Sequence, residues 1–121
     1  MAVLAEMKCT VCRAGDTPLD KFEIAQYHDQ IPEWEIVHED EIDRIRRVFK
    51  FKDFTSALAF TQAVGELAEQ EGHHPVITLQ WGRVDVVWWT HEIRGLHPND
   101  FIMAARSDEA YKEGNFEKSH E

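Results

Sequence analysis

The sequence predicts an α+β domain whose four-stranded antiparallel sheet has helices packed on one face. Its strand-like segments come as two hairpins, residues 34–52 and 75–90, rather than as single strands between helices. Between the hairpins, residues 53–70 show the apolar period of an amphipathic helix that covers a sheet. Predicted helices over residues 17–30 and 98–111 complete the order α-β-β-α-β-β-α.

Length and composition indicate one globular domain. With 121 residues, of which 43% are hydrophobic, the chain can build a two-layer core without disulfide bonds. Its 13 Lys and Arg against 23 Asp and Glu give a net charge of −10, which argues against direct nucleic-acid binding but not against a protein partner that itself binds DNA. No apolar run approaches about 18 residues. Since the sequence also shows no export signal and only two cysteines, we expect a cytoplasmic protein with no membrane partner.

Two terminal segments lie outside the predicted domain of residues 17–111. Residues 1–16 lack periodicity and are expected to form a mobile arm, and residues 112–121 are expected to form a charged tail. Cys9 and Cys12 make a single Cys-x-x-Cys motif. A structural zinc site usually needs four ligands, so a metal or redox role is disfavoured unless a dimer shares the zinc.

The first helix is expected to begin at Thr17, whose side chain can cap it. Pro18 suits the first helical position and Asp20 the third. The helix is expected to run to about Gln30, because Pro32 cannot continue it.

The first hairpin is predicted to join strands over residues 34–38 and 42–52 through a charged turn. Phe49 and Phe51 alternate onto one face of the second strand, as expected where one face is buried. The arginines of this strand are most simply a solvated face, and the alternative is that one of them binds an acidic partner. They are Arg44, Arg46 and Arg47.

The central helix is the most strongly patterned segment. Asp53 suits its N-cap and Gly72 its C-cap. His73 and His74 therefore follow at a helix-to-strand junction, where functional residues are common. The predicted apolar stripe comprises Phe54, Ala57, Leu58, Thr61, Val64 and Ala68, widened by Phe60 and Leu67.

The second hairpin is predicted to pair residues 75–81 with residues 84–90 through a type II′ turn at Gly82-Arg83. In that register His74 lies opposite His91, with Cβ atoms roughly 5 Å apart. A shift of one residue would place His73 there instead. The predicted core face comprises Ile77, Leu79, Trp81, Val84, Val86 and Trp88. The other face comprises Val76, Thr78, Val87 and Trp89, and is apolar enough for Val87 and Trp89 to be candidates for contact with another subunit.

The last helix is predicted to begin at Pro98 and to run to Tyr111. Asp100 lies in its first turn, where carboxylates are favoured in any helix. The alternative is that Asp100 holds a histidine in place, and both interpretations stay open. The side chains expected to face inward are Phe101, Ile102, Ala104 and Ala105.

His73, His74 and His91 form a candidate acid–base site. Histidine exchanges protons near neutral pH because its unperturbed pKa is about 6.5. A zinc triad is the alternative. Adjacent residues of a strand point to opposite faces, however, which disfavours joint ligation by His73 and His74. We therefore expect no metal.

The chain resembles the pterin-4a-carbinolamine dehydratases, also called 4a-hydroxytetrahydrobiopterin dehydratases, over roughly residues 19–110. One short motif of that family would be weak evidence of membership. The whole set of motifs, in this order and at these spacings, is specific for the family. The residues that carry the resemblance are His73-His74-Pro75, Trp81-Gly82, Thr90-His91, Gly95-Leu96 and Asp100, with Trp34, residues 49–54 and Ala59-Phe60 upstream.

The resemblance implies loss of water from a 4a-hydroxytetrahydropterin to give the quinonoid dihydropterin, as in tetrahydrobiopterin recycling, with no cofactor and no metal. It implies that His74 and His91 act as acid and base at the C4a centre, while His73 orients the pterin; the individual roles stay open. The residues expected to bind substrate or to support these histidines are Glu69, Trp89, Thr90 and Asp100.

Three positions depart from the family's pattern. Gly72 stands where the family often has an acidic residue, and Ile77 replaces an aromatic residue of some members. Trp89 occupies a position that is usually small and hydroxylated, so it could narrow the site or change the pterin accepted. These departures bear on substrate identity more than on reaction type.

A non-catalytic protein-binding module is the alternative function. Members of the family also act as dimerisation cofactors of a homeodomain transcription factor, and related chains serve as assembly factors. The complete set of His73, His74 and His91 favours the enzyme, because a scaffold has no need of it. The resemblance and the apolar hairpin face also lead us to expect a homodimer or homotetramer.

Overall fold

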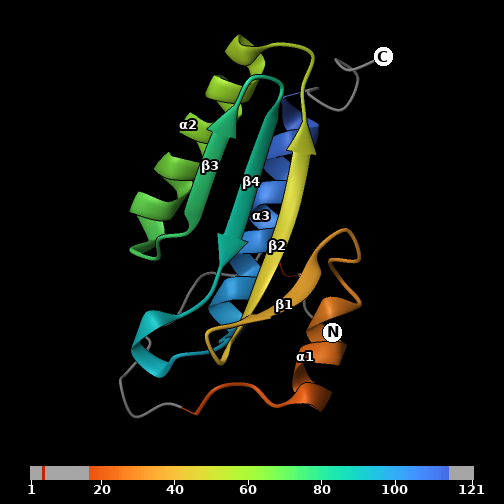
Figure 1. The fold of residues 1–121 in the computed structure, drawn as a ribbon, viewed down its shortest axis with the longest axis vertical. Coiled ribbons are helices and arrows are strands. Elements are labelled where there is room, and N and C mark those ends of the chain that lie inside the picture. The colour runs from red at the N-terminus through yellow and green to blue at the C-terminus, as the bar shows by residue number, and fades with distance from the viewer. Residues whose placement is uncertain (1–3, 5–16, 115–121) are drawn as a thin grey trace.

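The computed structural model describes Leu4 and residues 17–114, and it confirms the predicted α+β fold (Figure 1). Four strands form one sheet in the order β1-β2-β4-β3, and every neighbouring pair is antiparallel. The elements in chain order are α1 (Lys21–His28), β1 (Glu35–Glu39), β2 (Ile42–Lys50), α2 (Phe54–Glu71), β3 (Val76–Gln80), β4 (Arg83–Trp88), the 3-10 helix η2 (His91–Ile93) and α3 (Pro98–Glu113).

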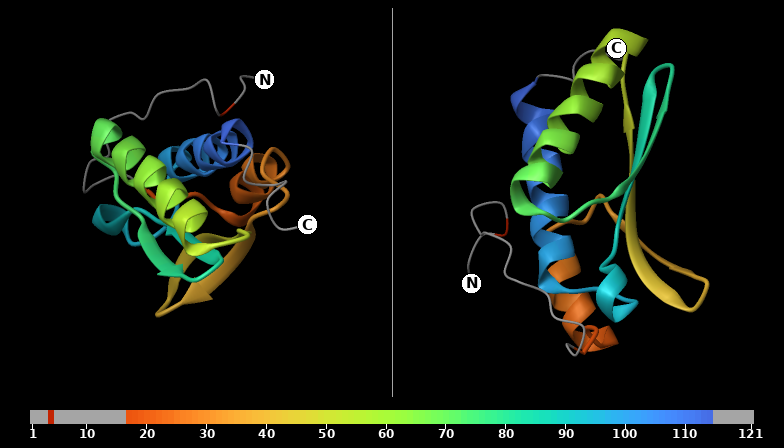
Figure 2. Two further views of the ribbon diagram at one scale, coloured as in Figure 1. Left: turned by 90° about the horizontal axis from the view of Figure 1, so that it is seen from above. Right: turned by 90° about the vertical axis from the view of Figure 1, so that its left-hand side faces the viewer.

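The two long helices, α2 and α3, cover the same face of the sheet (Figure 2). The core between the layers is rich in aromatic rings. Phe49 of β2 contacts Trp34, Phe60 and Tyr111, with ring centroids 4.6 to 5.9 Å apart. Burial of such rings supplies much of the apolar area that stabilises a domain of this size.

Helix α1 begins at Lys21, three residues later than a start at Pro18 would place it. Asp20 is its N-cap: the Asp20 carboxylate accepts a hydrogen bond from the Glu23 backbone N–H (2.8 Å), and the Glu23 carboxylate accepts one from the Asp20 N–H (3.1 Å). This reciprocal capping box outcompetes a cap at Thr17. The preceding residues extend along another segment instead, where the Leu19 N–H donates to the carbonyl oxygen of Leu96 (2.9 Å).

The arginines of β2 do not form a solvated face, so that prediction is wrong. Arg47 donates to the Asp108 carboxylate (2.6 Å), and burial raises the pKa of Asp108 despite hydrogen bonds from Trp34 and Arg47. Arg46 bridges Glu35 (2.8 Å) and Asp85 (2.7 Å) on the outer sheet face. The partner of Arg47 comes from α3, and those of Arg46 come from β1 and β4. The alternation of residues along one strand does not show such partners.

Helix α2 has the predicted caps, with Asp53 at its N-terminus and Gly72 in the left-handed region (φ +64°) at its C-terminus. Its buried stripe is narrower than expected. Phe54 and Leu58 are exposed rather than buried, because the helix turns a different side to the sheet. The residues it buries are Ala57, Phe60, Val64 and Ala68.

The second hairpin turns at Trp81-Gly82 rather than at Gly82-Arg83, so the predicted register is wrong. Gln80 pairs with Arg83 and Val76 with Val87. Gly82 has a φ of +81°, and a Cβ there would lie 3.1 Å from the carbonyl oxygen of Phe51. The correct register differs from the predicted one by two residues. The face of each strand residue is therefore unchanged, except that Trp81 lies exposed in the turn.

Helix α3 begins at Pro98 as predicted and ends at Glu113, two residues beyond the predicted Tyr111. Cys9, Cys12 and nearly all of the predicted N-terminal arm lie outside the described residues, as does the tail beyond Gly114. Within Leu4 and residues 17–114, no helix has the length and apolar character needed to cross a bilayer.

Candidate functional site

A fully buried carboxylate, Asp100, lies at the centre of the candidate site. One of its oxygens is 2.6 Å from Nε2 of His73, and the other accepts hydrogen bonds from the Thr90 hydroxyl (2.7 Å) and the His97 backbone N–H (3.0 Å). Buried carboxylates need such partners, because leaving them unpaired costs free energy. Asp100 therefore ties together three segments that are distant in sequence.

Local structure explains why these segments meet. The left-handed Gly72 ends α2, and the His73 backbone N–H donates to the carbonyl oxygen of Ala68 (3.1 Å), which reverses the chain. Asp100 is the third residue of α3, where it completes a capping box with His97. Both interpretations of Asp100 thus apply together: it caps a helix and holds a histidine.

His73 is the best-anchored of the three histidines. Its side chain is 12% exposed, and its ring stacks on Trp88, with centroids 5.5 Å apart and an interplanar angle of 18°. An ionised carboxylate can only accept a hydrogen bond, so toward such an Asp100 the donor is Nε2 of His73. The ring of His73 is therefore held in position between Asp100 and Trp88.

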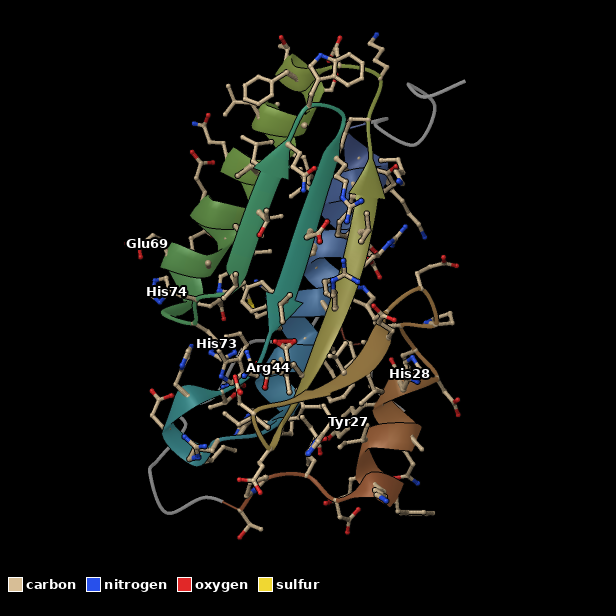
Figure 3. The ribbon with its side chains drawn as sticks, viewed as in Figure 1. Tyr27, His28, Arg44, Glu69, His73 and His74 are labelled. Atoms are coloured by element: carbon tan, nitrogen blue, oxygen red, sulfur yellow. The ribbon has the colours of Figure 1, made fainter. Side chains whose placement is uncertain are left out.

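His74 diverges from His73 and lies beside the C-terminal end of α2 (Figure 3). Its Nε2 is 2.6 Å from the Glu69 carboxylate, and both side chains are exposed, at 60% and 79%. The predicted supporting role of Glu69 is consistent with this contact. Among the described residues no hydrogen bond reaches Nδ1 of His74, and the side chain as a whole is exposed.

His91 does not lie opposite His73 or His74 in the second hairpin. The prediction that strand pairing brings these histidines together is therefore wrong. Strand β4 ends at Trp88, and Thr90 forms a bridge with Gly95 before the chain enters η2. His91 is exposed and is the first residue of η2. It is nevertheless tied to the Asp100 centre, because the preceding residue, Thr90, donates to Asp100.

Trp89 contacts the His91 ring, with centroids 4.5 Å apart and an interplanar angle of 46°. Its own exposure is 9%, since the Arg44 guanidinium lies over the indole at 4.2 Å from the ring centroid. The chain itself therefore covers most of this ring. Contact of Trp89 and Val87 with another subunit stays a prediction.

Two residues that support the site, His97 and Arg44, were not predicted from the sequence to do so. His97 caps α3 through its side chain, which accepts from the Asn99 N–H (3.0 Å), and the Pro98 and Asp100 that follow were the available signal for a cap there. Arg44 had no such signal, because its contact with Trp89 depends on pairing between β2 and β4.

A metal centre has no counterpart in the described structure. Among Leu4 and residues 17–114, no group of three or more His, Cys, Asp or Glu side chains is arranged to hold a metal ion. His73 and His74 each contact a different carboxylate instead. The site is thus a set of histidines with hydrogen-bonded or aromatic supports.

Comparison with known proteins identifies the family. The family described as "Pterin 4 alpha carbinolamine dehydratase" matches residues 17–110. A protein of Chlorobium limicola named "Putative pterin-4-alpha-carbinolamine dehydratase" is 53% identical over 107 residues, covering 88% of this chain and 95% of its own. One of the same name from Microcystis aeruginosa is 47% identical over 115 residues, covering 95% of this chain and 99% of its own.

Two solved structures share the fold. A crystal structure described as a transcriptional coactivator/pterin dehydratase from Brucella melitensis is 32% identical, with a TM-score of 0.72, over 78% of this chain and 98% of its own. A pterin dehydratase-like protein described as a RuBisCO assembly factor in the alpha-carboxysome is 22% identical, with a TM-score of 0.55, over 64% and 88%, and it shows the fold alone. With a matching family over most of its domain and relatives near half identity, the chain belongs to the pterin 4 alpha carbinolamine dehydratase family.

Proposed function

We propose that this protein catalyses the dehydration of a 4a-hydroxytetrahydropterin to the quinonoid dihydropterin, as in tetrahydrobiopterin recycling. The observation that carries the proposal is the Asp100 centre, which fixes His73 and also holds Thr90, the neighbour of His91. Family membership supports the substrate class. The reaction moves protons without any net oxidation, which suits a site made of histidines.

The reaction needs one acid and one base. The C4a–O bond breaks as the hydroxyl group takes a proton and leaves as water. The N5 lone pair forms the C4a=N5 double bond, and the N5 proton passes to a base. Hydroxide is a poor leaving group, so the acid matters most at the moment the C–O bond breaks. General acid–base catalysis of this kind contributes roughly 10²–10⁴-fold in rate.

The three histidines suit different parts of this reaction. His74 and His91 are exposed and are assigned to proton transfer, because a substrate can reach their rings. His73 is mostly covered and held by Asp100, so it is assigned to orienting the pterin. A fixed group of this kind lowers the entropic cost of aligning the reacting atoms.

Purified, chelator-treated protein should accelerate dehydration of 4a-hydroxytetrahydropterin at micromolar concentration. The variant His91→Ala should lose roughly 10²–10⁴-fold in turnover, while its free energy of unfolding changes by no more than about 1 kcal/mol. His38→Ala is the matched control, since His38 is an exposed histidine of β1 that pairs with Asp43. Wild-type protein that shows only the uncatalysed rate would overturn the proposal.

A non-catalytic binding role is the second candidate, favoured by the 32% identical solved structure that is described as a transcriptional coactivator/pterin dehydratase. The same measurements separate the two. A binding module would tolerate replacement of His91 without loss of its function, whereas the enzyme would not. Persistent turnover in His91→Ala would also show that the residue assignment is wrong.

We further propose that the protein acts in the cytoplasm as a homodimer or homotetramer. The edge strands β1 and β3 each have one unpaired side. Six large apolar side chains of the described residues are exposed: Phe22, Ile36, Phe54, Leu58, Val76 and Trp81. Exposed strand edges and apolar groups of this kind favour self-association. Light scattering should give a multiple of the 14.1 kDa chain mass, and a monomer at every concentration would contradict this.

A further inference from the structure

His91 is supported differently from the other two histidines. His73 and His74 each contact a carboxylate, Asp100 or Glu69, at 2.6 Å. Among the described residues, no hydrogen bond reaches the His91 ring, and its contact is the indole of Trp89. The orientation of His91 therefore depends on how firmly that indole is held.

Arg44 holds the indole from the neighbouring strand. Its guanidinium carbon lies 4.2 Å from the Trp89 ring centroid, a geometry in which a cation is attracted to the ring face. The attraction strengthens when water is excluded. Here the Arg44 side chain is 14% exposed, and its Nε is buried with no hydrogen-bond partner among the described residues.

The guanidinium of Arg44 is also bound to the turn between β1 and β2. Its Nη2 donates to the carbonyl oxygen of Glu39 (3.2 Å) and lies 3.6 Å from the Asp40 carboxylate. Arg44 lies at the same end of the sheet as His73 (Figure 3). The guanidinium is thus fixed on one side by the turn and presents its plane to the indole on the other.

Loss of this contact would leave the indole room to move. A hollow of about 150 Å³ adjoins it on the outer sheet face. The backbone on either side is fixed by the end of β4 and by the Thr90–Gly95 bridge, so the side-chain torsions of Trp89 are what Arg44 restrains. Besides Trp89 and Arg44, the hollow is lined by Val37, Glu39, Arg46, Val76 and Val87.

We propose that Arg44 is a positioning residue for His91, which it acts on through the indole of Trp89. This inference rests on the proposed function in assigning His91 to proton transfer. Arg44 touches no reacting atom; it sets the orientation of the ring against which His91 packs. The consequence is that a residue of β2 controls turnover at a site built from the segments after α2 and β4.

The first test is kinetic. Arg44→Met, which keeps a long side chain but removes the cation, should lower kcat about 10-fold while KM changes less than about 3-fold. This is within the roughly 10²-fold that a small misplacement of a catalytic group costs. Arg44→Lys should recover part of the loss. Arg46→Met is the matched control: Arg46 lies on the same strand face but pairs with Glu35 and Asp85, and kcat should stay unchanged.

A second test asks whether the effect passes through Trp89. In a Trp89→Ala background, adding Arg44→Met should lower kcat no further, because the ring that connects Arg44 with His91 is gone. Additive losses in this cycle would show that Arg44 acts by another route.

A third readout is independent of activity. The His91 ring protons, assigned by their loss in His91→Ala, feel the ring current of Trp89, so their NMR shifts should move toward solvent-exposed values in Arg44→Met but not in Arg46→Met. Unchanged shifts in Arg44→Met would overturn the inference, whatever happens to kcat. If wild-type protein shows no turnover while the shifts move as expected, the proposed function fails and the positioning of His91 by Arg44 stands.

Discussion

The Asp100–His73 pair and the Glu69–His74 pair have the same length, 2.6 Å, in opposite surroundings. Asp100 is fully buried and the His73 side chain is 12% exposed, whereas the side chains of Glu69 and His74 are 79% and 60% exposed. Distance alone would rank the two contacts as equal. Their surroundings make the first a structural centre and the second a local contact at the rim of the site.

Water explains the difference. An exposed carboxylate exchanges a protein partner for water at little cost, so such pairs contribute about 0–1 kcal/mol to stability. A buried carboxylate has no such alternative, and Asp100 has three donors that depend on it: His73, Thr90 and the backbone of His97. Removing the Asp100 carboxylate therefore leaves several polar groups without their hydrogen-bond acceptor, whereas removing that of Glu69 leaves His74 free to bind water.

The largest effect should come from Asp100→Ala. We expect it to lower the free energy of unfolding by about 3 kcal/mol, because the buried Thr90 hydroxyl and the partly covered His73 ring lose their acceptor. Turnover should fall as well, since His73 loses its anchor. Chemical denaturation measures the loss, and Asp100→Asn, which keeps one acceptor oxygen, should lose less. A loss below about 1 kcal/mol in the alanine variant would contradict the central role of Asp100.

A smaller effect should follow from removing one donor alone. Thr90→Val keeps the side-chain shape but removes the hydroxyl, and should cost about 1–2 kcal/mol of stability. Thr90→Ser keeps the hydroxyl and serves as the control. Wild-type stability in Thr90→Val, measured by thermal unfolding, would show that the Thr90–Asp100 hydrogen bond contributes nothing.

Asp85, on the outer sheet face, is a carboxylate intermediate between the buried Asp100 and the exposed Glu69. Partial burial raises its pKa, but hydrogen bonds from Arg83 and Arg46 outweigh this, and the net pKa is lowered. Because the folded-state pKa lies below the usual value of about 3.9, the carboxylate stabilises the fold above that value, and this contribution is lost as the pH falls through the folded-state pKa. Asp85→Asn should therefore be less stable than wild type by roughly 1 kcal/mol at pH 7. Unfolding curves from pH 7 to pH 2 should show this gap closing, and a gap that persists at pH 2 would point to another cause.

The smallest effect should come from Glu69→Gln. Stability should change by less than about 0.5 kcal/mol, as for most exposed substitutions, and added salt should reduce even that difference. Turnover should change only a few-fold, because the amide oxygen can still accept from His74. A loss of stability comparable to that of Asp100→Ala would remove the distinction between the two pairs.

The sequence predicted the arrangement of elements well because hydrophobic period reports which face of a strand or helix is buried. It could not report which residue pairs with which. The predicted hairpin register was wrong by two residues, and a two-residue shift leaves every face unchanged, so the pattern of Val84, Val86 and Trp88 is satisfied by both registers. In the observed turn Gly82 has a φ of +81°, and its carbonyl oxygen accepts a hydrogen bond from the Phe51 N–H (2.9 Å), a contact with the end of β2 that the pattern of the hairpin alone does not report.

The candidate site shows the same limit. His73, His74 and Asp100 could be selected from motifs, and the first and last of these do contact each other. The contact of Arg44 with Trp89 could not be predicted, because the sequence of β2 alone does not show which side chain of the neighbouring strand lies beside Arg44. Asp100 was ambiguous for a further reason: a helix cap and a histidine anchor require the same carboxylate at the same position.

Gly95 packs tightly against Pro18, so the loop after β4, which carries His91, is covered by the segment that precedes α1. A Cβ at position 95 would lie 2.8 Å from Cβ of Pro18, so no other amino acid fits there without displacing the segment that leads into α1. That segment is also held through the hydrogen bond from Leu19 to Leu96. A fragment trimmed to start at α1 would keep every strand and long helix yet uncover the loop that carries His91. The residues before the first helix thus belong to the cover of the candidate site, and tags or fusions are better attached upstream of Thr17.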